Sequence, residues 1–249
     1  MFSTTTRDTL NILQWNADGL TKAKIFELRE KLKESNIDIC CIQETNLFTD
    51  PRDPSKSDPD PIIPGYQPIR QDRKNHSSGG GLLTYIRHGI TFQRGKKSEV
   101  KAQEFQEIKI LLKKTWFPII NFYLPNTKTQ ITKFDPSLIP SSPIAFIVGD
   151  FNGHSRMWDQ LVPQNKRGEE VEKFILDHNL FLLNDGEPTR VNRGTGGGST
   201  PDLTICGQIW SKKTAWAAQE QLGDSDHLPI LSTISLNVNR QNIPPRKPS

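Results

Sequence analysis

Six short polar strings along the chain hold most of the residues that could do chemistry. In order they are QWNADG (14–19), IQET (42–45), YLPN (123–126), GDFN (149–152), DLTI (202–205) and SDHLP (225–229). Carboxylates, amides and a histidine of this kind can hold a hard divalent cation, activate water and neutralise negative charge. Each string alone also has an ordinary explanation, because a single Glu after a strand is usually solvated and GDFN fits a simple turn. Only their joint occurrence is informative.

Every string lies at one end of an expected strand. Apolar runs predict strands at 10–15, 37–42, 81–87, 104–112, 118–123, 144–148, 203–205, 215–218 and 228–236. Helices are expected at 22–35, where Ile25, Leu28 and Leu32 recur with helical spacing, and at 169–179. The first helix joins two strands, which favours their parallel pairing. Strand ends that face the same way can assemble a site on rigid elements.

This order of elements predicts an α/β (α+β) fold in which two sheets are covered by helices. No internal repeat is visible, and residues 46–68, rich in Pro, Asp and Ser, are expected to form a long surface loop. We expect one domain over residues 1–238. Residues 239–249 contain three prolines and no core-forming pattern, which indicates a basic tail or linker toward a further domain.

Composition excludes several classes of protein. No run of about eighteen apolar residues is present, so no membrane-spanning helix is expected. The N-terminal segment lacks the apolar centre of a secretory signal. Cys40, Cys41 and Cys206 form neither a disulfide framework nor a zinc motif, which favours a reducing compartment, the cytosol or nucleus.

The net charge of +4 does not by itself indicate a nucleic-acid partner. Arg240, Arg246 and Lys247 all lie in the expected tail, and without them 29 basic residues stand against 28 acidic ones, a net charge of +1. Any basic surface must therefore be local.

Taken together, the six strings resemble the endonuclease/exonuclease/phosphatase superfamily, and the resemblance extends over residues 10–236. Their variant forms resemble the apurinic/apyrimidinic-like endonuclease domain of non-LTR retrotransposons. The features concerned are GDFNGHS at 149–155 with Trp158 after it, Arg167-Gly168 ahead of a helix, and PDLT at 201–204. The resemblance implies a deoxyribonuclease I-like fold, a four-layer sandwich of two mixed β-sheets flanked by helices.

The resemblance also implies which residues are catalytic. These are Asn16, Glu44, Tyr123, Asp150, Asn152, Asp202 and His227. Asp150 would activate or orient the attacking water, while His227, oriented by Asp202, would contact the scissile phosphate as imidazolium. Whether Asp150 or His227 is the general base stays open.

Three further roles follow from the resemblance. Asn152 would hold the water or a phosphate oxygen, and Tyr123 and Asn16 would donate hydrogen bonds to phosphate oxygens or to the partners of the histidine. The implied cofactor is Mg²⁺, with Mn²⁺ able to substitute, and Glu44 is the principal ligand. Asp18 and Asp226 are additional candidate ligands, although Asp18 fits a purely turn-capping role equally well and Asp226 could instead orient Asn16.

DNA is the expected substrate, contacted by a second set of residues. This set comprises Asn126, His154, Ser155, Arg190, Asn192, Arg193 and Ser225. Residues 189–199 contain two arginines and four glycines, which fits either a hairpin that enters a DNA groove or a flexible connector.

The expected activity is Mg²⁺-dependent nicking of DNA that leaves a 3′-hydroxyl and a 5′-phosphate and so primes reverse transcription at the target site. The expected partner is a reverse transcriptase domain of the same polyprotein, the expected location is the nucleus, and no membrane is involved. An abasic-site repair endonuclease is the main alternative, and a catalytically inactive DNA-docking domain is the non-enzyme alternative. Target sequence, the number of metal ions, oligomeric state and host stay open.

Overall fold

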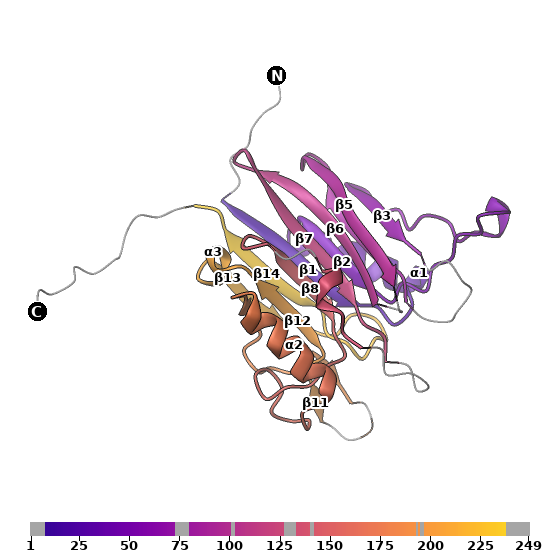
Figure 1. Cartoon of the computed structure of the whole chain (residues 1–249). Helices are drawn as coiled ribbons and strands as arrows, with labels where there is room; N and C mark the ends of the chain where they lie inside the picture. Colours follow the sequence, from indigo (N-terminus) through magenta and orange to yellow (C-terminus); the bar gives the residue numbers. More distant parts are fainter. Residues whose placement is uncertain are drawn as a thin grey trace, which may run out of the picture.

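The computed structural model describes residues 8–72, 80–100, 103–126, 133–139, 142–192, 194 and 197–237. Most of the strands form two six-stranded sheets that pack face to face (Figure 1). The first sheet has the order β13 (Thr214–Ala218), β14 (Ile230–Ser235), β1 (Thr9–Asn16), β2 (Ile39–Gln43), β4 (Leu82–Arg87) and β3 (Tyr66–Gln71). The second has the order β5 (Phe92–Val100), β6 (Gln103–Leu112), β7 (Thr115–Tyr123), β8 (Phe146–Asp150), β12 (Asp202–Cys206) and β9 (Phe181–Leu182).

Both sheets are mixed, as expected. β1 pairs with β2 in parallel and β7 pairs with β8 in parallel, while the remaining neighbours are antiparallel. A separate two-stranded ribbon joins β10 (Arg190–Val191) to β11 (Gly198–Ser199). The helical elements are α1 (Lys22–Glu34), α2 (Lys166–Asp177), α3 (Gln208–Ser211) and two short 3₁₀ turns at Pro54–Lys56 and Pro136–Leu138.

The side-chain period of two in the strands creates the four layers. In β1, Leu10 and Ile12 pack between the sheets, whereas Leu13 and Trp15 point to the other face and pack with Leu28 of α1. In the second sheet the strands turn their outer apolar residues toward α2, against Val171, Phe174 and Ile175. The layers are therefore α1, first sheet, second sheet and α2, which confirms the expected sandwich.

Several elements were not predicted. β5 has the sequence FQRGKKSEV and lies at a sheet edge, where one side is unpaired and charged residues are tolerated, so it lacks an apolar run. β3 contains Pro68 and also lies at an edge, where a missing N–H costs little. The long loop expected over 46–68 consequently ends earlier, because β3 begins at Tyr66. The expected tail at 239–249 lies outside the described residues.

Strand direction brings the polar strings to one edge of the sandwich. Parallel pairing sets Asn16 opposite Gln43, one residue before Glu44, and sets Tyr123 opposite Asp150. Antiparallel pairing then places Asp202, the first residue of β12, opposite Asp150, the last residue of β8. The C-terminal ends of β1, β2, β7 and β8 and the N-terminal end of β12 therefore lie at the same edge of the sandwich. Within the described part of the chain, no helix has the length and apolar character needed to span a membrane.

Candidate active site

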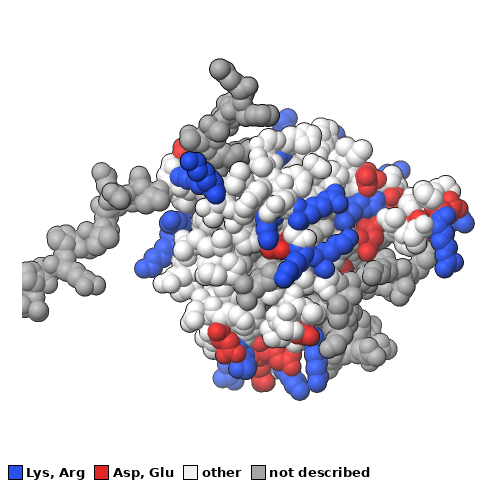
Figure 2. Space-filling model, turned by 45° about the horizontal axis from the view of Figure 1, so that its top comes forward, with Lys and Arg blue, Asp and Glu red and all other residues white. Residues whose placement is uncertain are grey.

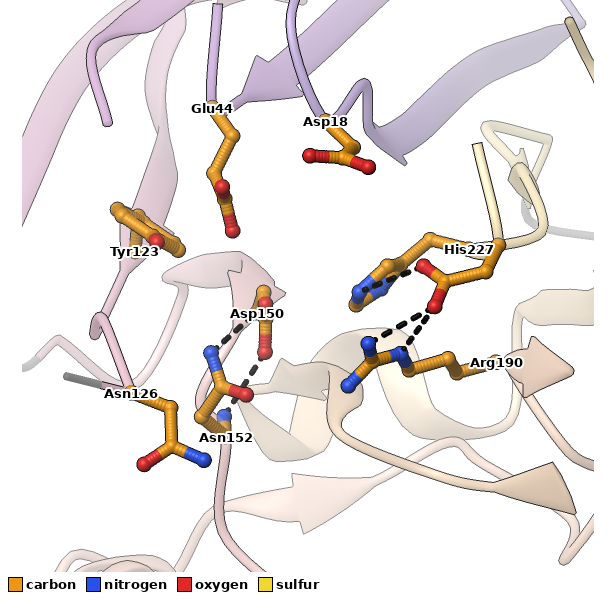
Figure 3. Close-up of a pocket in the computed structure, with 9 residues that line it drawn as sticks. Asp18, Glu44, Tyr123, Asn126, Asp150, Asn152, Arg190 and His227 are labelled. Atoms are coloured by element: carbon orange, nitrogen blue, oxygen red, sulfur yellow. Dashed lines mark hydrogen bonds and ion pairs between the residues drawn. The ribbon is translucent and has the colours of Figure 1, made fainter. Parts of the chain in front are cut away.

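A cleft of about 360 Å³ lies at this edge. It is lined by Asp18, Glu44, Tyr123, Asn126, Asp150, Asn152, Arg190, Asp226 and His227, all of which are predicted site residues. In Figure 3, Glu44 and Asp18 reach into the cleft from one side, and Asp150 and Asn152 lie across from them. The segments after β1 and β2 thus face the end of β8.

Asn16 links the two sheets beneath the cleft. Its side chain is buried, and Nδ2 donates to Glu44 Oε1 at 2.9 Å and to Asp150 Oδ2 at 2.8 Å. Its Oδ1 accepts from the backbone N–H of Asp18 at 3.0 Å, which holds the turn in which Asp18 has a φ of 45°. One amide therefore positions two carboxylates and the backbone of Asp18, and both of its N–H groups are already used. Of the two roles expected for Asn16, donation to phosphate oxygens or to partners of the histidine, this arrangement leaves no N–H group for phosphate.

Asp150 is fully buried at the end of β8 and accepts three hydrogen bonds. Besides Asn16, the donors are the backbone N–H of Asn152 at 2.8 Å and its Nδ2 at 2.9 Å. Asn152 adopts a φ of 47°, and its Nδ2 also donates to the carbonyl of Leu124 at 3.1 Å. Since the Asn152 amide has no N–H left for a phosphate, its role is to hold Asp150, not to bind substrate through that nitrogen.

Close sheet packing supports this loop. A Cβ at Gly149 would lie 1.8 Å from the carbonyl oxygen of Phe122 on β7, so only glycine fits directly before Asp150. The pKa of Asp150 is raised to about 7, mainly because the carboxyl is buried. The nearby Asp202 and Glu44 carboxylates raise this pKa further, while the His227 imidazolium lowers it.

His227 and Asp202 form a buried pair at the floor of the cleft. Nδ1 of His227 lies 2.8 Å from Oδ2 of Asp202, and the Asp202 residue is 1% exposed. Burial of the imidazole lowers its pKa, but the Asp202 carboxylate outweighs this and raises the pKa of His227 to about 9. At neutral pH this pKa makes His227 a cation, and its hydrogen bond to Asp202 fixes its orientation.

Arg190 and Asp226 form an ion pair in the wall of the cleft. Nε and Nη2 of Arg190 donate to Oδ2 of Asp226 at 2.9 and 2.8 Å. The other oxygen, Oδ1, lies 3.7 Å from Nε2 of His227. Asp226, expected as a metal ligand, therefore has a guanidinium and an imidazole as its neighbours.

Comparison with known proteins shows where this fold and site are found. Residues 117–231 match the family described as endonuclease-reverse transcriptase. A 25% identical relative, over 92% of this chain and 24% of its own length, is the RNA-directed DNA polymerase from mobile element jockey of Drosophila melanogaster. The chain thus spans about a quarter of the length of this curated relative.

Two solved structures share the fold. The endonuclease domain of TRAS1, a telomere-specific non-LTR retrotransposon, has a TM-score of 0.67 at 16% identity and covers 92% of this chain and 99% of its own. The AP endonuclease LMAP from Leishmania major has a TM-score of 0.73 at 15% identity, over 92% of this chain and 88% of its own. In sequence and in fold, the chain is thus similar to nucleases of the endonuclease/exonuclease/phosphatase superfamily. It is an enzyme of the hydrolytic nuclease class, of the type found in non-LTR retrotransposons and AP endonucleases.

Members of this superfamily depend on a divalent metal, and two groups of side chains here offer ligands. Asp150, Asp202 and His227 bring one ligand atom each within 4.8 Å of one another. However, Nδ1 of His227 is bonded to Asp202, and Asp150 already accepts three hydrogen bonds. Glu44 is only partly buried and Asp18 is exposed, and both carboxylates line the cleft. Oxygen ligands open to water are the donor set that Mg²⁺ prefers, so Glu44 and Asp18 fit the cofactor better.

The residues expected to contact DNA are dispersed. Asn126 is exposed and lines the cleft together with Arg190, while Asn192 is exposed at the end of β10 and outside the lining. His154 also lies outside it, with Nδ1 bonded to Asp159 at 2.9 Å, and Arg193 is not among the described residues. Figure 2 shows Lys and Arg in local clusters with acidic residues between them, which agrees with the low charge surplus.

Two of the expected DNA contacts are wrong. Ser225 has no exposed surface, and its Oγ donates to the Asn16 carbonyl at 2.8 Å and accepts from the His227 N–H at 3.2 Å. Ser155 is equally buried, and its Oγ bonds to Glu172 and accepts from the N–H of Met157 at 3.1 Å. Both hydroxyls brace loops from inside, because a polar group buried in a turn must find an internal partner.

Three supporting residues of the nuclease site escaped the sequence assignment. Thr189 Oγ1 donates to Oδ2 of Asp202 at 2.8 Å, and buried Arg167 donates to the carbonyls of Asn152 at 3.0 Å and Pro125 at 3.2 Å. Lys24 is buried in α1, and its Nζ lies 2.7 Å from the carbonyl oxygen of Ala17. Arg167 already belonged to the retroelement-like Arg-Gly pair, which was its signal. The sequence gives no such signal for Lys24, because its hydrogen-bond partner, the Ala17 carbonyl, lies outside helix α1.

Proposed function

We propose that this domain nicks one strand of DNA with Mg²⁺ as cofactor, leaving a 3′-hydroxyl and a 5′-phosphate. The observation that carries the proposal is the arrangement of partly exposed Glu44 across one cleft from buried Asp150 and the charged His227–Asp202 pair. Phosphodiester hydrolysis needs a base that accepts a proton from the attacking water and cationic groups beside the phosphate oxygens. It also needs a group that stabilises the leaving oxygen. Those three requirements match the contents of the cleft.

The two shifted pKa values support an assignment of the acid–base roles that the sequence left open. With a pKa of about 7, Asp150 is partly ionised at neutral pH and can accept a proton from the attacking water. With a pKa of about 9, His227 is already protonated and cannot act as base, so it donates from Nε2 to a non-bridging phosphate oxygen. Asp150 is therefore the base and His227 the phosphate-binding cation.

The remaining groups hold the reaction geometry. When bound at Glu44 and Asp18, Mg²⁺ would withdraw charge from the phosphate and its leaving oxygen. Water forms the new bond to phosphorus, the bond from phosphorus to the 3′ oxygen breaks, and the water proton passes to Asp150. The departing 3′ oxygen takes a proton from solvent to become the 3′-hydroxyl. Tyr123 lines the cleft and is paired opposite Asp150, which supports a role for its hydroxyl as donor to a phosphate oxygen.

The relatives support a proposal for the biological role. The jockey relative is named as an RNA-directed DNA polymerase, and this chain corresponds to a quarter of it. We infer that the domain works with a reverse transcriptase domain of the same polyprotein and that its nick primes reverse transcription at chromosomal DNA in the nucleus.

A plasmid assay tests the proposal. Supercoiled plasmid with the domain and Mg²⁺ should become nicked circles, Mn²⁺ should substitute, and EDTA should block the reaction. Asp150→Asn keeps the size of the side chain but cannot accept the proton, and it should be inactive. Plasmid that stays supercoiled with folded wild-type protein would instead favour a DNA-docking role.

The likeness to an AP endonuclease structure, TM-score 0.73, keeps abasic-site cleavage as a second candidate. Two duplexes of the same sequence, one with a single abasic site, separate the two functions. We expect similar cleavage of both duplexes. Cleavage confined to the abasic strand would assign the domain to repair.

A further inference from the structure

The Arg190–Asp226 pair is built into a rigid part of the structure. The backbone N–H of Val191 donates to the carbonyl of Asp226 at 2.8 Å, and that of Leu228 donates to the carbonyl of Thr189 at 2.7 Å. Arg190 also forms an isolated antiparallel bridge with His227. The base of the β10–β11 ribbon is therefore paired to the segment that carries the catalytic histidine. This pairing fixes the backbone of Arg190 relative to Asp226 and His227.

The environment of Asp226 disfavours a divalent cation there. Oδ2 accepts from two nitrogens of Arg190, and Oδ1 lies 3.7 Å from Nε2 of His227. A cation on this carboxylate would lie beside the Arg190 guanidinium, and like charges at such distances repel strongly in a partly buried site. By contrast, the Glu44 carboxylate accepts from the neutral amide of Asn16, and that amide also holds the Asp18 turn.

Arg190 keeps donors for a ligand while it holds Asp226. Its side chain is 40% exposed, and Nε and Nη2 are the nitrogens bound to the carboxylate. Figure 3 shows its third nitrogen pointing away from that pair. A guanidinium has five N–H donors in a planar fork that suits phosphate, so donors remain for a phosphate oxygen in the cleft.

We propose that Arg190 is the second cation of this site: it keeps Asp226 out of the metal ligands, contacts the scissile phosphate, and so leaves a cleft that takes one divalent ion. The phosphate contact rests on the proposed function. The exclusion of metal from Asp226 does not, because it concerns the protein without DNA.

Counting bound Mn²⁺ by electron paramagnetic resonance tests the exclusion. The wild-type chain should bind one ion, and Glu44→Gln should lose it. Arg190→Ala frees Asp226 and should gain a second ion, which Arg190→Ala combined with Asp226→Ala should lose again. Arg190→Gln serves if the alanine variant does not fold. Arg29→Ala is the matched control, since Arg29 also binds a carboxylate, that of Glu30 at 2.9 Å, but lies on α1 away from the cleft.

Two ions in the wild-type protein, or only one ion in the single variants Arg190→Ala and Arg190→Gln, would overturn the exclusion. For the phosphate contact, binding of a short DNA duplex in EDTA is measured at several salt concentrations. Arg190→Ala should reduce the slope of log affinity against log salt by about one, and Arg29→Ala should not change it. An unchanged slope overturns the phosphate contact. Neither readout uses cleavage, so the ion count still decides the exclusion for a domain that fails to nick plasmid.

Discussion

His227 and Asp202 are joined by a 2.8 Å hydrogen bond from Nδ1 to Oδ2, and Thr189 Oγ1 donates to that same oxygen at 2.8 Å. The Thr189 hydroxyl thus orients the Asp202 carboxylate, and this carboxylate orients the His227 imidazole. Its second oxygen, Oδ1, is buried without a hydrogen-bond partner among the described residues. Removing either side chain should therefore remove the function of the pair.

The first prediction is that Asp202→Ala and His227→Ala are strongly non-additive. Each should lower the nicking rate by about 100-fold or more, the range for a positioned proton-bearing group. The double variant should lose little beyond the worse single variant, because an unoriented imidazole has already lost its role. Single-turnover nicking rates of the three variants give the coupling. Losses that simply multiply would show that the pair does not function as a unit.

The second prediction concerns Glu44. Glu44→Ala removes the principal metal ligand and should lower nicking by roughly 1,000-fold, as expected for loss of several kcal/mol of transition-state stabilisation. The melting temperature should barely change, because Glu44 is only partly buried. Glu34→Ala, an exposed carboxylate on α1, is the control and should nick normally. Near wild-type activity in the Glu44 variant would remove Glu44 from the metal site.

The third prediction is a bell-shaped dependence of kcat/KM on pH. Asp150 must lose its proton to act as base, so activity rises through its pKa of about 7, which burial and the Asp202 carboxylate raise. His227 must keep its proton, so activity falls above its pKa of about 9. His227→Ala should abolish the alkaline limb and move the acidic limb upward, since the imidazolium holds the pKa of Asp150 down. A profile that is flat through both values would contradict these roles.

The fourth prediction is about the ends of the nick. Water attacks phosphorus and the 3′ oxygen leaves, so the products should be a 3′-hydroxyl and a 5′-phosphate. A DNA polymerase should extend the nicked strand directly, and pretreatment with a 3′-phosphatase should make no difference. Extension that requires this pretreatment would mean that the opposite bond is broken and that the nick cannot prime synthesis.

The fifth prediction assigns target choice to the β10–β11 ribbon. Replacing residues 192–197 with Asn-Gly, a pair suited to a two-residue hairpin turn, keeps Val191 paired with Gly198 while removing the residues between them. Nick positions on plasmid DNA should change, whereas Mn²⁺ binding should not, because the ligands lie elsewhere in the cleft. Identical nick positions on a sequencing gel would limit residues 192–197 to non-specific contacts.

Much of the scaffold could be predicted because burial patterns are local. The apolar run that contains Cys40 and Cys41 forms the buried strand β2, with alternate residues facing the other sheet and α1. A strand–helix–strand order predicts parallel strands, and parallel strands end together, so Asn16 and Glu44 were expected near one another. Edge strands such as β5 were missed since an edge carries no continuous apolar signal.

The partners of the polar side chains could not be read from the chain. Ser225 and Asp226 are adjacent in SDHLP, yet Ser225 is buried against Asn16 and Asp226 lies in the cleft wall against Arg190. Residue type states which hydrogen bonds a side chain is able to make, and strand period states which face it occupies. Which partner it meets depends on segments more than a hundred residues away, as between Asn16 and Asp150, and only packing of the two sheets brings those within 2.8 Å.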